Sequence, residues 1–455
     1  MAGAMCAFWL AGRAATANNA ASLAGLAMIV VAVFGYDAET PFPSLYALLP
    51  VAGSALIILF AGAGTWAGAL LASRPFVGIG LISYSSYLWH QPLFAFARLA
   101  SLEPPGLPLM LALAGLALVL AWLSWRYVEA PFRKGAASLL PSQRSVFVAS
   151  AAGALLFVGV GGAVMAFQPA LQRHWLAGHP SIAANYQLVQ YSKEHRNLGA
   201  RLDGPQRFSE CRFNVATIDA KVEAALIACA RRHGPGVMVL GDSHAIDLFG
   251  VLASRFDAPF LVGITQGFCR PHKPMPQCQY DGMLRFVAAH PQSLRAIYYT
   301  QAGFYLMLDE RGNKGARTMF ANRGLADSVG RITPDPDHIG KTAAYLDELA
   351  RHVPVQWLGP IIEPHMPKKL ILTQGCAGAY ALRPQQAAVF RQLDAELARR
   401  ATGARYRYRS MIDLYDLDLA RDFCVGGQLA FNDGDHFTAA GETMFGRRLP
   451  ADFLN

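Results

Sequence analysis

A serine follows an apolar run, after one glycine and one aspartate, in the segment VMVLGDSHAIDLF, residues 237–249. The run is typical of a buried strand, and the residues after Ser243 have the three-to-four spacing of a helix. Gly241 permits a tight turn, and Asp242 can accept hydrogen bonds that hold it. A serine at such a corner presents its hydroxyl beside helix amides that can stabilise an oxyanion, which is the chemistry of acyl transfer. A simple helix cap is the alternative, because serine and aspartate favour cap positions.

The segment FNDGDHFTAAGETMF near the C-terminus supplies a candidate base for this serine. Asp433 lies three residues before His436, in an expected loop ahead of a short final helix. A carboxylate in that place can hold the imidazole in the tautomer that accepts the serine proton. Asp435 is a second candidate for this role, and the spacing does not choose between the two.

Strands and helices are expected to alternate from about residue 236 onward. Strands are predicted at VMVL (237), PFLVGI (259), AIYYT (296) and VPVQWLG (353), and helices at AIDLFGVLASRF, GMLRFVAAH and TAAYLDELARHV. This alternation predicts an α/β domain with a parallel sheet covered on both faces. Ligands bind such sheets at the carboxyl ends of the strands, where Ser243 is expected to lie.

The GDSH and DGDH segments together resemble the SGNH hydrolase family. The resemblance implies that Ser243 is the nucleophile, His436 the base and Asp433 its orienting carboxylate. The family completes its oxyanion hole with a glycine and an asparagine beside the serine amide. Gly267 in ITQGFCRPH matches the glycine, whereas the expected asparagine segment reads YYTQAGFYL, where Gln301 could substitute.

The first third of the chain is almost free of charge. Up to residue 172 it carries seven Lys or Arg and four Asp or Glu, out of 40 and 31 in the whole chain. Each of five charge-free runs can supply the roughly 20 apolar residues that span a bilayer: Ala14–Tyr36, Thr40–Ser73, Pro75–Ala97, Pro104–Trp125 and Ser145–Gln172. We therefore expect about five transmembrane helices, with Met1–Gly12 as a fragment of another.

Basic residues predict how these helices are oriented. Arg133, Lys134 and Arg144 share the loop before the last run, and Arg13 and Arg74 fall on the same side if the helices alternate. That side should be cytoplasmic, which places residues 173–455 outside the cytoplasm. The expected location is the bacterial inner membrane, with a periplasmic C-terminal domain.

Six of the seven cysteines lie in the exported part. An even number in an oxidising compartment indicates disulfides. Proximity favours the sequential pairing, which joins Cys211 to Cys229, Cys269 to Cys278 and Cys376 to Cys424. A zinc site is disfavoured because no pair has the short Cys-x-x-Cys spacing, so no metal is expected. The net charge of +9 does not indicate nucleic acid, since no basic cluster is interleaved with aromatic residues.

Two polar segments interrupt the membrane part, GLISYSSYLWHQPLF at 80–94 and RYVEAPFRK at 126–134. Together with the two SGNH motifs they resemble the acyltransferase-3 family of membrane O-acyltransferases, in the branch that carries a fused SGNH domain. Arg126 and Glu129 match that family's Arg-x-x-Glu-x-Pro signature, and Arg126 could bind the donor phosphate. An ion pair that holds the loop is the alternative.

The resemblance implies four segments: a partial acyltransferase-3 membrane domain (1–135), a linking transmembrane helix (136–172), a periplasmic connector (173–235) and an SGNH-like domain (236–455). It also implies an N-terminal truncation, because the family has about ten membrane helices before the linking one. A separate protein would then supply the missing helices.

The activity implied is transfer of an acyl group, usually acetyl from cytoplasmic acetyl-CoA, to a hydroxyl of lipopolysaccharide, peptidoglycan or another exported glycan. The expected partners are membrane lipid and the glycan acceptor, with no tightly bound cofactor and no nucleic acid. Two other readings stay open: an SGNH-type glycan acetylesterase, and a non-catalytic membrane-anchored half of a split protein.

Overall fold

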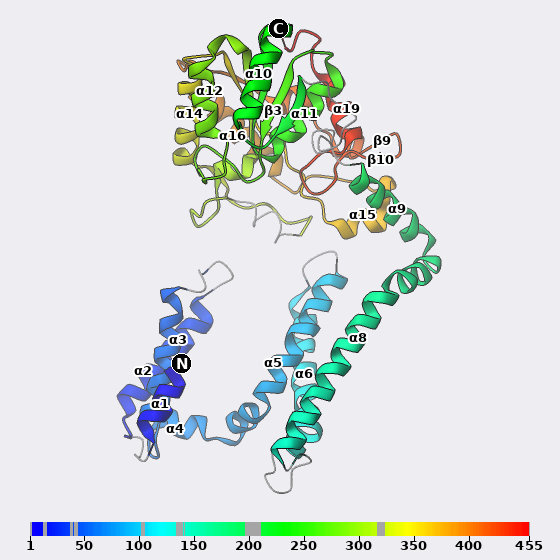
Figure 1. The fold of residues 1–455 in the computed structure, drawn as a ribbon. Helices are drawn as coiled ribbons and strands as arrows, with labels where there is room; N and C mark the ends of the chain where they lie inside the picture. Colours follow the sequence, from blue (N-terminus) through cyan, green and yellow to red (C-terminus); the bar gives the residue numbers. More distant parts are fainter. Residues whose placement is uncertain are drawn as a thin grey trace. The chain divides into compact units, whose positions relative to one another are not determined.

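A six-stranded sheet forms the centre of the C-terminal part of the computed structural model (Figure 1). Its order is β1-β3-β2-β4-β7-β8, and all neighbouring strands are parallel. The strands are β1 (Arg212–Val215), β2 (Gly236–Gly241), β3 (Leu261–Thr265), β4 (Leu294–Thr300), β7 (Val355–Leu358) and β8 (Arg407–Arg409). The predicted parallel α/β domain is confirmed.

The structure describes residues 2–11, 16–36, 40, 44–101, 105–132, 140, 142–195, 211–315 and 324–454. The chain divides into one unit of residues 1–100 and 105–158, and a second of 101–104 and 159–455. Arg13, Arg133 and Lys134, on which the predicted membrane orientation rests, lie outside the described residues.

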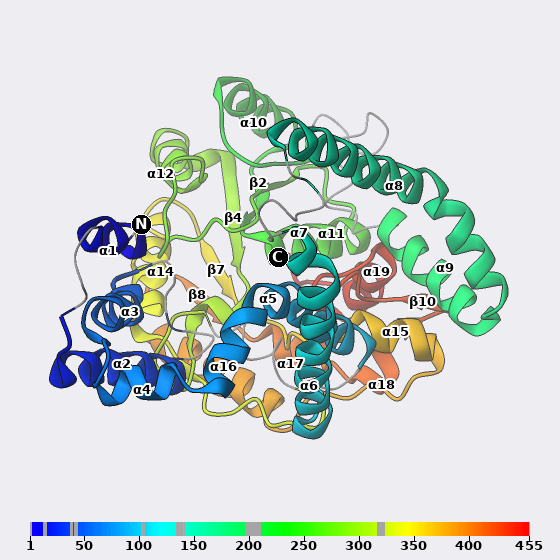
Figure 2. The ribbon, with the colours of Figure 1, turned by 90° about the horizontal axis from the view of Figure 1, so that it is seen from below.

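Helices cover both faces of the sheet. One face carries α10 (Ala220–His233), α12 (Tyr280–Ala289), α14 (Pro336–Leu349) and α16 (Gln386–Arg400). The other carries α11 (Ser243–Arg255), α17 (Met411–Tyr415) and α19 (Ala439–Arg448). Figures 1 and 2 both show α12 and α14 on one side of the strands and α19 on the other.

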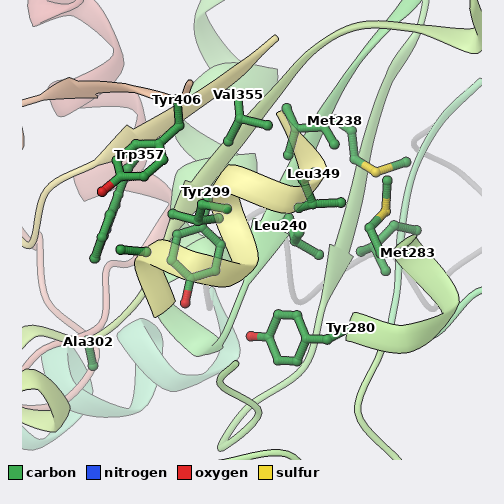
Figure 3. Packing of buried hydrophobic residues seen from close by; sticks show 14 of the residues in the cluster. Met238, Leu240, Tyr280, Met283, Tyr299, Ala302, Leu349, Val355, Trp357 and Tyr406 are labelled. Atoms are coloured by element: carbon green, nitrogen blue, oxygen red, sulfur yellow. The ribbon is translucent and has the colours of Figure 1, made fainter. Parts of the chain in front are cut away.

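The alternation of side chains along β2 divides the core between these two faces. Met238 and Leu240 pack into the cluster under α10, α12, α14 and α16, part of which Figure 3 shows. Val237 and Val239 pack into the cluster under α11, α17 and α19. All four are fully buried. A strand buried on both faces is a continuous apolar run, which is why VMVL was recognisable in the sequence.

The sheet takes in more of the chain than the segment 236–455. β1 pairs in parallel with β3, and α10 packs on the sheet, although both lie in the segment 173–235 that we expected to be a connector. The sequence did not predict β1 because its four residues, RFNV, form an edge strand. Their side chains are only half buried, so the strand has no apolar run.

Shorter elements complete this unit. They are α9 (Pro180–Glu194), α15 (Lys368–Gln374), α18 (Leu419–Asp422), the two-stranded pairs β5 (Met307–Leu308) with β6 (Thr333–Pro334) and β9 (Cys424–Val425) with β10 (Gln428–Leu429), and the 3-10 turns η5 (Pro291–Ser293), η6 (Gly303–Leu306) and η7 (Gly375–Ala377). α9 packs against α15, where the Asn185 side-chain amide donates to the Leu372 carbonyl at 3.0 Å.

The N-terminal part of the chain is helical. It contains α1 (Ala2–Leu10), α2 (Asn19–Gly35), the 3-10 turn η1 (Leu45–Ala47), α3 (Leu48–Phe60), α4 (Trp66–Leu71), α5 (Arg74–Ala100), α6 (Leu107–Ser124), the π-helical turn η2 (Trp125–Glu129) and α7 (Ala130–Phe132). The long helix α8 (Gln143–Ala177) follows. Two continuous helices in the described residues, Leu107–Phe132 and Gln143–Ala177, are long and apolar enough to cross a membrane.

The other three expected spans have less complete counterparts. Asn19–Gly35 and Leu45–Phe60 are apolar but shorter, and α5 is a continuous helix that contains the polar residues of GLISYSSYLWHQP. The run Thr40–Ser73, expected to form one helix, instead divides into α3 and α4. Gly64 at the break has a positive φ of 86°, and the Thr65 hydroxyl caps α4 by accepting from the Gly68 amide at 3.1 Å. The count of five spans stays a prediction.

Three disulfides join the six cysteines of the second unit. They link Cys211 to Cys229, Cys269 to Cys278 and Cys376 to Cys424, which is the sequential pairing. Disulfides persist in oxidising compartments, so this unit is suited to the outside of the cytoplasm.

Replacing Cys376 and Cys424 together by serine is expected to lower the free energy of unfolding by about 4 kcal/mol, because this bridge closes a loop of 48 residues in the unfolded chain. Cys376 is exposed and Cys424 half-buried, so little packing is lost and the loop-closure effect dominates. Denaturant unfolding without reductant measures the change. A loss below about 1 kcal/mol would contradict the chain-entropy argument.

Candidate active site

The turn between β2 and α11 presents Ser243 at the carboxyl end of the central strand. Gly241 has a φ of 151°, and a Cβ atom there would lie 1.9 Å from the Thr300 carbonyl oxygen of β4. The Gly241 carbonyl accepts from the Gln266 amide at 3.2 Å and from Gln279 Nε2 at 2.8 Å. This turn therefore requires glycine, and two hydrogen bonds to the Gly241 carbonyl fix its backbone.

Asp242 ties the serine turn to the end of β4. Its fully buried carboxylate accepts from the His244 backbone amide at 3.0 Å and from the Ala302 amide at 3.1 Å. Burial raises the pKa of Asp242, although the nearby His244 ring opposes the change. Asp242 is the N-cap of α11, so the cap interpretation holds for Asp242 and leaves the Ser243 side chain available.

The loop before α19 holds His436 through Asp433. His436 Nδ1 lies 3.0 Å from both carboxylate oxygens of Asp433. The same carboxylate accepts from the backbone amides of Asp435 at 3.0 Å and His436 at 2.9 Å. Asp433 thus fixes both the loop and the imidazole ring. The Nδ1–H of His436 faces the carboxylate, which leaves Nε2 for proton transfer.

Asp435 lies between two histidines. Its side chain is almost fully buried, with one oxygen 3.4 Å from His436 Nδ1 and the other 3.6 Å from His244 Nε2. The two imidazole ring centroids are 5.2 Å apart. Both carboxylates that the sequence offered as orienters are therefore near His436, and only Asp433 lies within hydrogen-bond distance on both oxygens.

These charges stabilise one another. Burial lowers the pKa of His436, but Asp433 and Asp435 outweigh it and raise the pKa to about 12. Burial also lowers the pKa of His244, and Asp435 outweighs it and raises the pKa to about 9. The pKa of Asp433 lies below its usual value, because the His436 ring outweighs the effect of burial. The carboxylates thus favour the protonated form of both imidazole rings, and the rings favour the ionised form of Asp433.

The bond between base and nucleophile is not formed in this structure. His436 Nε2 is buried and makes no hydrogen bond within the described part of the chain, Ser243 included. The structure therefore contains the His436–Asp433 half of a triad, while the role of Ser243 stays a prediction. Catalytic hydrogen bonds are often long before substrate binds.

The two oxyanion candidates differ in how they are placed. A Cβ atom added to Gly267 would lie 4.0 Å from the Ser243 Cβ, so the loop after β3 passes directly beside the serine. Gln301 is buried, and its Oε1 accepts from the Tyr299 hydroxyl at 2.5 Å. Its Nε2 has no hydrogen-bond partner among residues 211–315 and 324–454 or elsewhere in the described chain. The Nε2 group of Gln301 is therefore available to donate a hydrogen bond, while Tyr299 fixes the side chain through Oε1.

The membrane candidates lie in the first unit. Arg126 and Glu129 belong to the π-helical turn η2, which follows α6 directly. The Ser85 hydroxyl of α5 donates to the Glu129 carboxylate, and the Arg126 guanidinium lies 5.7 Å from the Tyr127 ring centroid. Trp89 Nε1 donates to the Ser124 hydroxyl at 2.8 Å, so polar contacts join α5 and α6 beside the signature. π-helical turns occur often at functional sites.

Within the residues that the structure describes, two sets could hold a metal ion by distance alone, and both include Asp435. They are His244 with Asp435 and His436, and Glu363 with His365 and Asp435, each with possible ligand atoms within 4.8 Å of one another. His365 Nε2 lies 3.2 Å from the Glu363 carboxylate, so each histidine already faces a carboxylate. We therefore interpret the cluster as ion pairs around the base.

His244, Glu363 and His365 are the residues of this cluster that the motifs did not single out. His244 was visible as the last letter of GDSH. Nothing in the sequence marks Glu363, which is fully buried and accepts from the Gly303 amide at 2.7 Å. Its place depends on the loop after β7 lying beside the loop after β4.

The domain has a parallel sheet covered by helices on both faces, a serine at the end of β2 and a histidine–aspartate pair in the loop before α19, which is an SGNH-like arrangement. The chain belongs to the family described as "SGNH domain (fused to AT3 domains)", whose model matches residues 210–451, more than half of the chain. The matched range begins before β1, in agreement with the observed sheet.

Two solved structures are similar to this chain. The periplasmic domain of the Salmonella ser. Paratyphi A lipopolysaccharide acetyltransferase has 14% identity and a TM-score of 0.38, covering 59% of this chain and 97% of its own. A protein named after platelet activating factor, from Streptococcus pneumonia, has 13% identity and a TM-score of 0.27, covering 52% of this chain and 92% of its own. Both likenesses are too distant to bear on activity. No curated protein matches the chain significantly.

Gly241→Ala is expected to destabilise the protein by about 3 kcal/mol or more, because its Cβ would overlap the Thr300 carbonyl. Gly267→Ala is the matched control: the same methyl group would meet only the Ser243 Cβ, at an ordinary contact distance. Thermal unfolding of both variants measures the difference. Equal stabilities would contradict the close approach of β2 to β4.

Asp435→Asn is expected to shift the pH dependence of Ser243-dependent hydrolysis of 4-nitrophenyl acetate. His436 must lose its Nε2 proton to act as a base, so the rate should rise with pH. Asp435 raises the pKa of His436, and removing its charge should move that rise to lower pH by about one unit or more. Because the pKa of His436 lies above this range, profiles between about pH 6 and 10 should show the shift as a rate about tenfold higher at each pH in Asp435→Asn than in the wild type. Asp413→Asn, at an exposed carboxylate, should leave the profile in place.

Proposed function

We propose that this chain is a membrane O-acyltransferase that carries an acyl group, most simply acetyl, to a hydroxyl of an exported glycan such as lipopolysaccharide or peptidoglycan. The observation that carries the proposal is the His436–Asp433 pair in an SGNH domain of the kind fused to acyltransferase-3 domains. The apolar helices that precede the domain support the same assignment.

In the proposed reaction His436 Nε2, once deprotonated, takes the proton of the Ser243 hydroxyl as Oγ attacks the carbonyl carbon of an acyl donor. The carbonyl oxygen becomes an oxyanion, which the backbone amides of Ser243 and Gly267 would stabilise, with Gln301 Nε2 as a third donor. Collapse breaks the bond to the leaving group, which takes the proton from His436. The product is an ester on Ser243.

The second half of the reaction repeats these roles with a different nucleophile. His436 takes the proton of the acceptor hydroxyl, the hydroxyl oxygen attacks the Ser243 ester, and the proton returns to Oγ as the serine leaves. The atoms balance as transfer of one acyl group from donor to glycan.

Acetyl-CoA in the cytoplasm is the proposed original donor. The membrane helices would pass the acyl group outward, with Arg126 holding a donor phosphate through its guanidinium fork and Glu129 holding the turn. The SGNH domain would then act outside the cytoplasm, where its three disulfides persist.

The acceptor separates this proposal from a glycan acetylesterase that uses the same serine. Water, at about 55 M, competes with the sugar hydroxyl for the acyl-serine. The hydroxyl can react faster than water only if the protein holds it in place, because effective concentrations of well-oriented groups exceed that of water. The rate at which glycan and water discharge the acyl-serine is therefore the decisive measurement.

Full-length protein in detergent, mixed with 4-nitrophenyl acetate, is expected to gain one acetyl group on Ser243. Intact mass should show the adduct in the wild type and none in Ser243→Ala. Ser254→Ala is the matched control on the same helix, since the Ser254 hydroxyl donates to the Val251 carbonyl.

The transferase assignment predicts that glycan accelerates discharge of the wild-type adduct well beyond water. Equal discharge by water alone would indicate an esterase. An adduct that persists in Ser243→Ala would place the acyl group elsewhere and overturn the proposed nucleophile.

A further inference from the structure

Phe268 is the one large hydrophobic side chain exposed in the described residues 211–315 and 324–454, with an exposed fraction of 65%. All other large apolar side chains in those ranges are buried or partly buried. An isolated apolar side chain on a surface is common, so exposure alone decides nothing. Three further observations set this residue apart.

The backbone of Phe268 is strained. Its φ is +67°, in the left-handed region that favours glycine and that bulky residues rarely occupy. The ring is largely exposed, so its burial offsets little of the cost of this backbone conformation. Strained residues of this kind cluster at functional sites.

Phe268 also stands next to the proposed nucleophile. It follows Gly267 directly, and Gly267 is the residue whose added Cβ would meet the Ser243 Cβ at 4.0 Å. The exposed side chain therefore leaves the loop at the residue next to the glycine that lies beside the serine.

The loop that carries the ring is fixed on its C-terminal side. Cys269 forms a disulfide with Cys278, its amide donates to the Gln266 carbonyl at 3.2 Å, and its carbonyl accepts from the Tyr280 hydroxyl at 2.7 Å. An exposed ring on a fixed backbone can form a preorganised binding surface, because little loop freedom is lost when a ligand binds.

We propose that Phe268 is a platform on which a sugar ring of the acceptor glycan stacks beside Ser243. Sugar rings present a face of C–H groups between their hydroxyls, and that apolar face can pack on an aromatic ring. Stacking would hold the acceptor hydroxyl near the acyl-serine, which transfer in competition with water requires. The inference rests on the proposed function and adds how its acceptor is bound.

A lipid surface is the other apolar partner that an exposed ring could meet. Interfacial binding scales with the buried apolar area and needs several apolar side chains on one face. Phe268 has no second exposed large hydrophobic residue in its described domain, residues 211–315 and 324–454. The glycan is therefore the occupant to which we commit.

The test measures how the wild type and Phe268 variants, as full-length acetyl-enzymes in nanodiscs, are discharged by two probes: chitopentaose and delipidated O-polysaccharide. With the probe that discharges the wild type faster, Phe268→Ala and Phe268→Leu should each raise the half-saturating glycan concentration about fivefold. Phe268→Trp should stay within about twofold of the wild type, because it keeps an aromatic face. Tyr191→Ala, which removes an exposed ring from α9, is the matched control and should saturate like the wild type.

Phe268→Gly provides a second readout that a structural role would not produce. It should raise the half-saturating concentration like Phe268→Ala and also raise the melting temperature, because glycine relieves the positive φ. A fall in melting temperature would mean that the ring stabilises the fold, and would overturn the proposal.

Two other results would overturn it. One is that Phe268→Leu saturates like the wild type, since stacking needs a ring. The other is that Phe268→Ala saturates like the wild type, because the ring would then contact something other than the acceptor, such as the lipid of the nanodisc. If neither probe discharges the wild-type adduct faster than water, the proposed transferase function itself is wrong, and this inference falls with it.

Discussion

The close approach of β2 to β4 at Gly241 is the constraint on which the candidate site depends. The Thr300 carbonyl occupies the place where any other residue would carry its Cβ. This proximity lets the Asp242 carboxylate reach the Ala302 amide after β4 while it caps α11. Ser243 is consequently presented by a turn whose geometry two strands and one helix determine together, so its position owes little to its own side chain.

Electrostatics shape the other half of the site. Two carboxylates and two imidazoles lie close together at the site: Asp433, Asp435, His244 and His436. Each charge reduces the free-energy cost of burying a neighbouring charge of opposite sign. The arrangement holds His436 rigidly. It also raises the pKa of the ring, so precise orientation is accompanied by a small fraction of the neutral form that can accept a proton. Substrate binding that weakens the contact with either carboxylate would lower this pKa and increase the neutral fraction.

Much of the domain could be predicted because its signals are local. The central strands are apolar runs, since helices cover both faces, and the serine and histidine motifs each fall within a few residues. The cysteine pairs follow from proximity along the chain. The rest depends on contacts between distant segments. β1 and β8 are edge strands without an apolar run, Gln301 is placed by Tyr299, and Glu363 reaches Gly303 across two loops. Hydropathy also treats Thr40–Ser73 as one run, while a cap at Thr65 and the backbone of Gly64 divide it.

Both edges of the sheet are short. β1 contributes four residues at one edge and β8 three at the other, and two of the three β8 residues are arginines. Unpaired strand edges invite pairing with another chain, and shortness and charge both oppose it. The domain is thereby protected from sheet-to-sheet aggregation, and the longer, fully buried strands β2 and β3 of its core lie between other strands, away from either edge.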